Sequence, residues 1–218
     1  MNNYSTLKQK HRARRENFPN DLSVRIHRAL SWLERAEKEI SDPDASFIFH
    51  WISFNAAYSG NISEEQGYSE KSAFYSFFEQ ISKHDERNEV YTIIWERFSQ
   101  EVRGILSNKY IFSSYWRHSN GDDDSFWENS FHASIQKTNN VLASQDNCTI
   151  LSILFSRIYV LRNQIFHGNA TWNGRVNRSQ VKDCQKLLAV LLPCLLNIMM
   201  DNPDKEWGEL AYPIKGND

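Results

Sequence analysis

The chain has 218 residues, 40% hydrophobic and 13% aromatic, which is enough for one sizeable core and at most two small domains. The formal net charge of −2 provides no global positive field, so any binding of nucleic acid needs a local basic patch. The three cysteines, Cys148, Cys184 and Cys194, form no CxxC pair, which argues against a disulfide framework or a structural zinc site and favours a reducing compartment.

Helices are predicted along nearly the whole chain, because no sustained alternation of apolar and polar residues indicates a sheet. Residues 1–19 carry the basic run "LKQKHRARREN", and we expect a mobile solvated arm there, with contact to a phosphate backbone as the alternative. Residues 21–40 place apolar side chains at three- and four-residue spacing, which predicts an amphipathic helix.

The next predicted helix begins at Asp42 or Asp44, either of which can cap it, and ends at Gly60. It is apolar nearly all round, so we expect it at the centre of the fold. His50 is expected to be a hydrogen-bonded core or edge histidine rather than a ligand. Asn55 is expected to be a core amide that fixes helix packing, with support of a functional site as the alternative.

Helical spacing continues over residues 69–83 and 87–116 and, after a polar loop, over 126–143. The loop lacks the twelfth-position glutamate and the glycine in register that a calcium-binding loop requires. We therefore expect its acidic residues to cap a helix and to face solvent.

Two strongly periodic helices complete the chain, one from Ile150 to Ile165 and one from Val181 to Ile198. The most apolar stretch, residues 187–200, is too short to span a bilayer, and the chain does not open on a basic-then-apolar signal peptide. We therefore expect one globular domain over residues 20–214 in a soluble, cytoplasmic protein without membrane contact.

The common catalytic motifs are missing from the sequence. It contains no GxGxxG or GxxxxGK[ST] phosphate loop, no GxSxG elbow and no HExxH zinc motif. The seven histidines include no pair at metal-binding helical spacing. We expect no metal and no other cofactor.

The strongest candidate site is the polar group in "LRNQIFHG", residues 161–168. Asn163 and His167 share one face of a helix, whereas Arg162 and His167 diverge by about 140°. The divergence is relieved if His167 lies in the last turn before Gly168, or if a two-fold-related partner supplies half of the site. An imidazole can move a proton, a guanidinium can neutralise a phosphate and an amide can orient either, which are the parts of a metal-free ribonuclease.

Ordinary helix capping is the alternative for this group, because a polar last turn followed by glycine is a common helix end. Downstream of the motif, one aromatic side chain and three cations suit a flexible single strand of RNA. These candidate RNA-binding residues are Trp172, Arg175, Arg178 and Lys182.

The segment "RNQIFH" resembles the R-x4-6-H motif of the HEPN superfamily, including the polar residue directly after the arginine. The segments "RALSWLERAE", "FIFHWISFNAAY", "LRNQIFHGNATWNGRVNRSQV" and "MMDNPDKEWGELAYP" are similar to bacterial HEPN-domain proteins, so the likeness covers roughly residues 20–214. The resemblance implies an all-α, up-and-down helical bundle with additional helices, and a homodimer that joins two motifs in a cleft. It also implies metal-independent RNA cleavage in which Arg162 and His167 are catalytic and Asn163 orients or tunes them.

One departure from the family concerns regulation. Some HEPN toxins paired with nucleotidyltransferase antitoxins carry a tyrosine two places after the histidine, where AMP is attached, and this chain has Asn169 there. The expected function is an endoribonuclease of the toxin or defence type, with RNA, a second copy and an antitoxin or regulatory protein as partners. The alternative is a non-catalytic helical module that binds nucleotide, RNA or a partner protein.

Overall fold

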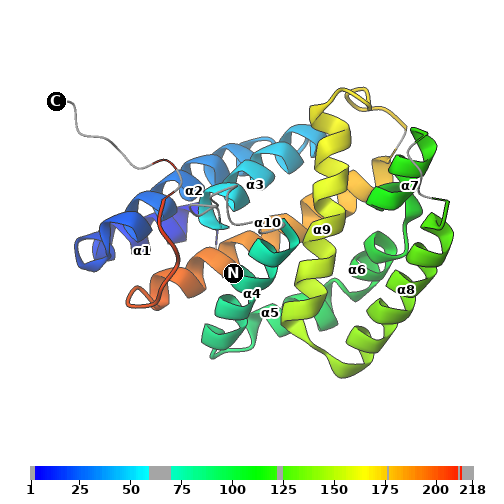
Figure 1. Cartoon of the computed structure of the whole chain (residues 1–218). Coiled ribbons are helices and arrows are strands. Elements are labelled where there is room, and N and C mark those ends of the chain that lie inside the picture. The colour runs from blue at the N-terminus through cyan, green and yellow to red at the C-terminus, as the bar shows by residue number, and fades with distance from the viewer. Residues whose placement is uncertain (1–2, 59–69, 122–124, 176, 211, 213–218) are drawn as a thin grey trace.

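A computed structural model describes residues 3–58, 70–121, 125–175, 177–210 and 212. Over these residues the protein is all-helical and has no strand, as the sequence pattern predicted (Figure 1). The α-helices are α1 (Tyr4–Arg14), α2 (Asn20–Lys38), α3 (Pro43–Tyr58), α4 (Glu70–His84), α5 (Glu89–Tyr91), α6 (Ser99–Leu106), α7 (Ser113–Ser119), α8 (Trp127–Ser144), α9 (Asn147–Phe166) and α10 (Arg178–Asp201). Short 3-10 or π segments are η1 (Arg15–Asn17), η3 (Thr92–Arg97) and η4 (Lys109–Ile111).

The helices form a bundle in which α9 is the dividing element. It lies between α3 and α4 on one side and α6, α7 and α8 on the other (Figure 1). Helix α3 packs along α2 and α10, and α4 packs along α9. Side chains on opposite faces of α9 therefore meet different neighbours.

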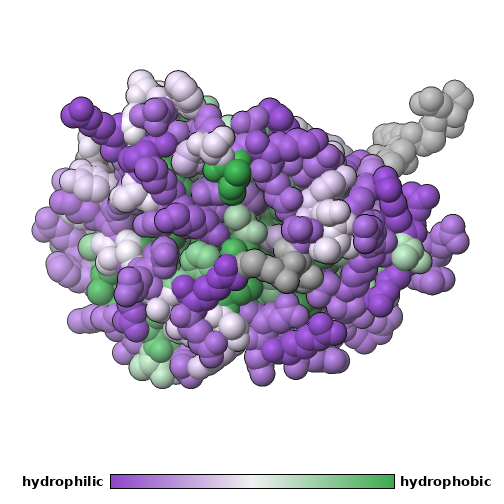
Figure 2. Space-filling model, turned by 180° about the vertical axis from the view of Figure 1, so that it is seen from behind, coloured by the Kyte–Doolittle hydropathy of each residue, from purple (hydrophilic) through white to green (hydrophobic). Residues whose placement is uncertain are grey.

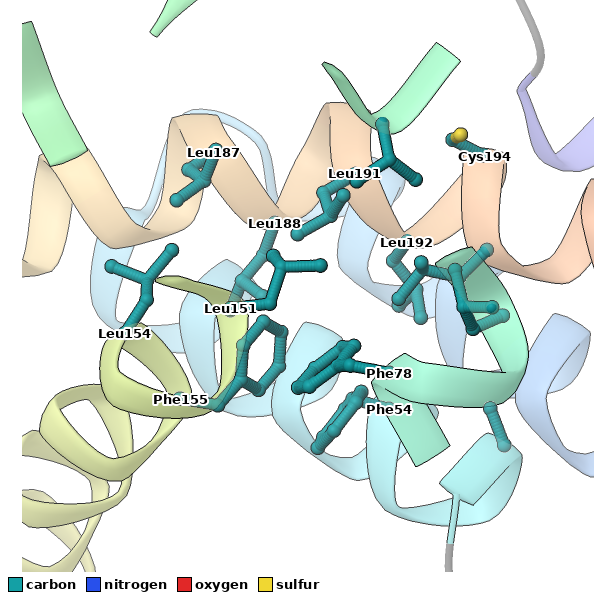
Figure 3. Packing of buried hydrophobic residues seen from close by; sticks show 14 of the residues in the cluster. Phe54, Phe78, Leu151, Leu154, Phe155, Leu187, Leu188, Leu191, Leu192 and Cys194 are labelled. Carbon is teal, nitrogen blue, oxygen red and sulfur yellow. The ribbon is translucent and has the colours of Figure 1, made fainter. Parts of the chain in front are cut away.

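An aromatic cluster holds α3, α4 and α9 together. Phe54 on α3 is completely buried, and its ring centroid lies 4.3 Å from that of Phe155 on α9. Phe78 on α4 lies 4.8 Å from Phe155, and leucines of α10 close the cluster from the other side (Figure 3). The central position predicted for the apolar helix of residues 47–58 is confirmed.

The basic segment that was expected to be a mobile arm is instead a packed helix, α1. Leu7 and His11 are buried in it, and Leu7 belongs to the main hydrophobic core. The Lys10 Nζ and Arg14 Nη1 atoms lie 2.7 and 3.0 Å from an Asp201 carboxylate oxygen. The carboxylate at the end of α10 attracts these cations, but only the folded chain brings it near them.

The segment over residues 87–116 is helical but not continuous. It divides into α5, η3, α6, η4 and α7. The Asp85 carboxylate accepts hydrogen bonds from the backbone N–H groups of Glu89 and Val90, which starts the first piece. The N–H of Phe98 donates to the carbonyl of Ile93, five residues earlier. This hydrogen bond belongs to the wider π turn of η3, which separates α5 from α6.

The other predicted helices match α2, α4, α8, α9 and α10 closely. Asp42 caps α3, since its Oδ1 accepts hydrogen bonds from the N–H groups of Asp44 and Ala45. The predicted stop at Gly60 and the acidic residues 122–124 lie outside the described residues.

Helix α10 is longer than its most apolar stretch suggested. By length and composition alone it could cross a membrane, but 78% of its most apolar window is buried inside the protein, as in a core helix. The face of the molecule seen in Figure 2 is mostly hydrophilic, with hydrophobic side chains in small separate areas. The apolar side chains of α10 thus serve the core.

We expect Phe54→Ala to lower the free energy of unfolding by about 3–5 kcal/mol, because it removes the ring at the centre of the aromatic cluster. Urea unfolding followed by circular dichroism measures this. Phe126→Ala is the matched control: its ring is 70% exposed, so the change should stay within about 0.5 kcal/mol. Equal losses in the two variants would contradict the central place of Phe54.

Candidate functional site

The carboxyl end of α9 positions the predicted catalytic residues. The N–H of Gly168 donates to the carbonyl of Ile165, and the N–H of Asn169 donates to the carbonyl of Gln164. Gly168 has a φ of +71°, which L side chains rarely adopt. These bonds form a Schellman cap, so the capping role expected from the glycine is present.

His167 is the C-cap residue itself, with φ −89° and ψ 10°. Its backbone N–H donates to the carbonyl of Asn163, and its side chain is exposed. The imidazole has no hydrogen bond or ion pair to another described residue. Capping therefore occupies the backbone of His167 and leaves the ring available.

Arg162 is half-buried and is held by its own helix. Its Nη1 donates to the Asn163 side-chain oxygen at 2.9 Å, and its guanidinium carbon lies 4.1 Å from the ring centroid of Phe166. Its Nε is buried without a hydrogen-bond partner among the described residues. No described carboxylate pairs with it, so the cation is oriented but not neutralised.

Arg162 also lines a cavity of about 450 Å³ between α2, α3, α9 and the segment near Leu210. Arg28 and Asn55 line the same cavity, together with the aromatic side chains of Tyr58 and Tyr159. Two guanidinium groups, an amide and aromatic rings around one space suit an anion that carries a ring.

The structure does not bring His167 into this cavity. It is absent from the lining residues, and no hydrogen bond joins its ring to the Arg162 side chain. Within one chain, Arg162 faces the α3 side of α9 and His167 stands at the exposed helix end. Of the three predicted catalytic side chains, only those of Arg162 and Asn163 are hydrogen-bonded to each other within one chain.

Two acidic residues at the start of α3 anchor the loop after α9. The Trp172 Nε1 donates to Asp42 Oδ2 at 2.8 Å, and the backbone N–H of Asn173 donates to Asp44. Burial alone would raise the pKa of Asp42, but the hydrogen bonds from Trp172 and from backbone N–H groups outweigh it and lower that pKa.

Arg178 completes this anchor. Its Nη2 forms an ion pair with Asp44 at 2.5 Å, and its Nε donates to the carbonyl of Gly174 at 3.1 Å. Both side chains of the pair are largely buried, at 19% and 9% exposure. Arg178 is therefore tied to α3, whereas the other candidate RNA-binding residues are exposed: Trp172, Arg175 and Lys182.

Arg28 and Asn55 line the Arg162 cavity but were not predicted as site residues. Asn55, expected as a core amide, is half-buried and lines the cavity, which agrees with the alternative considered for it. An amide inside an otherwise apolar helix was the available signal. The sequence contained no comparable signal for Arg28, because it is one of many cations on amphipathic helices.

The candidate site includes neither the buried His50 nor, among the described residues, a group of metal-binding side chains. His50 is buried in α3, where its Nδ1 lies 2.8 Å from the Ser46 carbonyl, and burial lowers its pKa to about 4. Within the described ranges, no group of three or more His, Cys, Asp and Glu side chains is placed to hold a metal ion.

Comparisons of the chain with known protein families, with curated proteins and with solved structures found no match.

We expect Asp44→Asn to destabilise the protein by about 2–3 kcal/mol, because it leaves the Arg178 cation without its counter-charge in a largely buried place. Urea unfolding measures the loss. Glu39→Gln is the matched control, since it removes the same type of group from the exposed pair with Arg35 and should cost under about 1 kcal/mol. A loss no larger than that of the control would show that Asp44 does not anchor the loop.

Proposed function

We propose that the protein is a metal-independent endoribonuclease of the HEPN type that cleaves single-stranded RNA at a homodimer cleft. The proposed catalytic residues are Arg162 and His167, with Asn163 as the residue that orients the arginine. We further propose a toxin or defence role, in which an antitoxin or regulatory protein restrains the activity. The single observation that carries the proposal is the state of the motif at the end of α9: the Arg162 guanidinium is oriented but not neutralised, and the exposed His167 imidazole has no partner among the described residues.

The arginine has the properties that an electrostatic catalyst requires. The Asn163 amide and the Phe166 ring fix the guanidinium in place, and no described carboxylate cancels its charge. A cation held in position before the reaction stabilises a phosphorane-like transition state without reorganisation. The hydrogen bond from Arg162 to Asn163 also supports an orienting role for the amide.

The histidine has the exposure that a proton-transfer group requires. Its ring stands in solvent at a helix end, where an RNA strand can approach it. In the proposed reaction, His167 takes the proton of a ribose 2′-OH, and the 2′ oxygen forms a bond to the adjacent phosphorus. The bond from phosphorus to the 5′ oxygen then breaks, and this oxygen takes a proton from water while His167 returns its proton to solvent. The products are a cyclic 2′,3′-phosphate and a 5′-OH end.

We propose that a second copy of the chain brings the two groups together. In one chain Arg162 and His167 serve different spaces, so the proposed site takes the arginine of one copy and the histidine of its partner. Trp172, with 73% of its surface exposed, is proposed to stack on a base, while Arg175 and Lys182 contact phosphates. Arg178 would act indirectly, by holding the Trp172 loop on Asp44.

A second candidate function is favoured by the cavity of about 450 Å³. It gathers Arg28, Arg162, Asn55 and two tyrosines without including His167. A ligand bound there would not meet the His167 imidazole. This arrangement suits a non-catalytic module that binds a nucleotide or a strand end.

We expect His167→Ala to slow cleavage of single-stranded RNA in EDTA by about 10²–10⁴-fold, and Arg162→Ala by at least about 10²-fold. Gel analysis of a labelled oligonucleotide measures the rates. His132→Ala and Arg87→Ala are matched controls, because both side chains are exposed and lie outside the motif. An oligonucleotide with 2′-deoxyribose throughout should not be cleaved. Equal rates in all five proteins would remove the assignment, and binding without turnover would favour the second candidate.

Mixing two inactive variants tests the shared site. If equal amounts of Arg162→Ala and His167→Ala chains pair at random, half of the dimers contain one chain of each kind. Each of these mixed dimers has one complete site out of two, so the mixture should regain about a quarter of the wild-type rate. No recovery would contradict a site built across the two copies.

A further inference from the structure

A second cavity lies on the opposite side of α9 from Arg162, between α8, α9 and the connection from η4 to α7. Its volume is about 400 Å³. Arg157, five residues before Arg162 and therefore about 140° away around the helix, is among its lining residues. The two arginines thus serve separate spaces.

Arg157 is the most unusual charged group of this region, because only 3% of it is exposed. Its guanidinium carbon lies 4.3 Å from the ring centroid of Phe112 and 5.6 Å from that of Phe131. Its Nη2 donates to the Ser134 hydroxyl at 3.0 Å, and its Nη1 has no hydrogen-bond partner among the described residues. Two aromatic faces and one hydroxyl therefore hold a cation whose hydrogen-bonding capacity is only partly used.

No carboxylate of the described chain neutralises Arg157. It forms no ion pair there, and burial alone lowers its pKa to about 10, with no opposing charge to raise it. The group stays charged near neutral pH. A buried charge without a counter-charge is unfavourable, so an anion in the neighbouring cavity would stabilise it.

The rest of the cavity supplies what a phosphate group requires. Lys137 on α8 lines it and has no ion pair to a described residue, which places a second cation at the same space. Ser113 and Ser130, which both carry a hydroxyl group, are among the lining residues as well. Ile153 and Val160 add an apolar wall, against which the ring or carbon part of a ligand can lie. Guanidinium, ammonium and hydroxyl donors around one space match the oxygens of a phosphate.

We propose that the cavity lined by Arg157, Lys137 and Ser130 binds a small phosphorylated ligand, with its phosphate toward the two cations. The ligand supplies the counter-charge that no described residue gives to Arg157. This site is independent of the proposed ribonuclease site, since it shares no residue with the motif at the end of α9. Inorganic phosphate and a phosphate ester offer the same chemistry, and the experiment separates them.

Isothermal titration calorimetry of the full chain with AMP, inorganic phosphate and adenosine tests the proposal. We expect AMP to bind more tightly than inorganic phosphate, and adenosine to bind at least about tenfold more weakly than AMP. Lys137→Ala should weaken AMP binding at least about tenfold, because it removes an exposed cation without disturbing the core. Arg157→Met should abolish binding, and circular dichroism shows whether that variant folds.

Lys83→Ala and Lys186→Ala are the controls, since both remove exposed cations that line neither cavity. Both should leave AMP binding unchanged. Arg162→Ala and Arg28→Ala distinguish this cavity from the one on the other side of α9. The proposal is overturned if neither AMP nor phosphate binds at millimolar concentration, or if Lys137→Ala binds as the wild type does. It is also overturned if the loss appears in Arg162→Ala and Arg28→Ala instead. Phosphate and AMP binding with equal affinity would overturn the part assigned to the apolar wall.

Discussion

The contact between the Phe54 and Phe155 rings, 4.3 Å apart between centroids, is the constraint on which both candidate sites depend. It fixes α9 against α3, while α4 and α10 close the same cluster (Figure 3). Because a packed core of this kind deforms little, the two faces of α9 are held at fixed distances from their neighbours. One face carries Arg162 toward α3, and the other carries Arg157 toward α8.

The protein buries several arginines and satisfies them in different ways. Arg25 donates to backbone carbonyls, including that of Ala57 at 3.0 Å, and Arg178 pairs with Asp44. Those two cations tie the chain together. Arg157 and Arg162 are held mainly by aromatic rings and one neutral side chain each, with no described carboxylate. Orientation without neutralisation leaves their charge available for an anion, which is the common physical basis of the two proposals.

At the end of α9, ordinary helix capping and a functional role for the side chains are compatible. The Schellman cap uses the backbone of Gly168 and Asn169 together with the carbonyls of Ile165 and Gln164. None of these bonds involves the side chain of His167 or Arg162. An ordinary helix end can therefore present an imidazole to solvent at no cost to its capping, and a functional role needs no distortion of the helix.

Three- and four-residue spacing and helix capping are local properties, so the residue pattern was sufficient to predict the all-α class, the long helices and the end of α9 at His167 and Gly168. The packing of the basic segment as α1 could not be predicted in this way, because its partner Asp201 lies near the other end of the chain. The same holds for the anchoring of Arg178 by Asp44 and for the meeting of Arg28 and Asn55 with Arg162. Such contacts join residues far apart in the chain, and spacing along one helix carries no information about which helix will lie opposite.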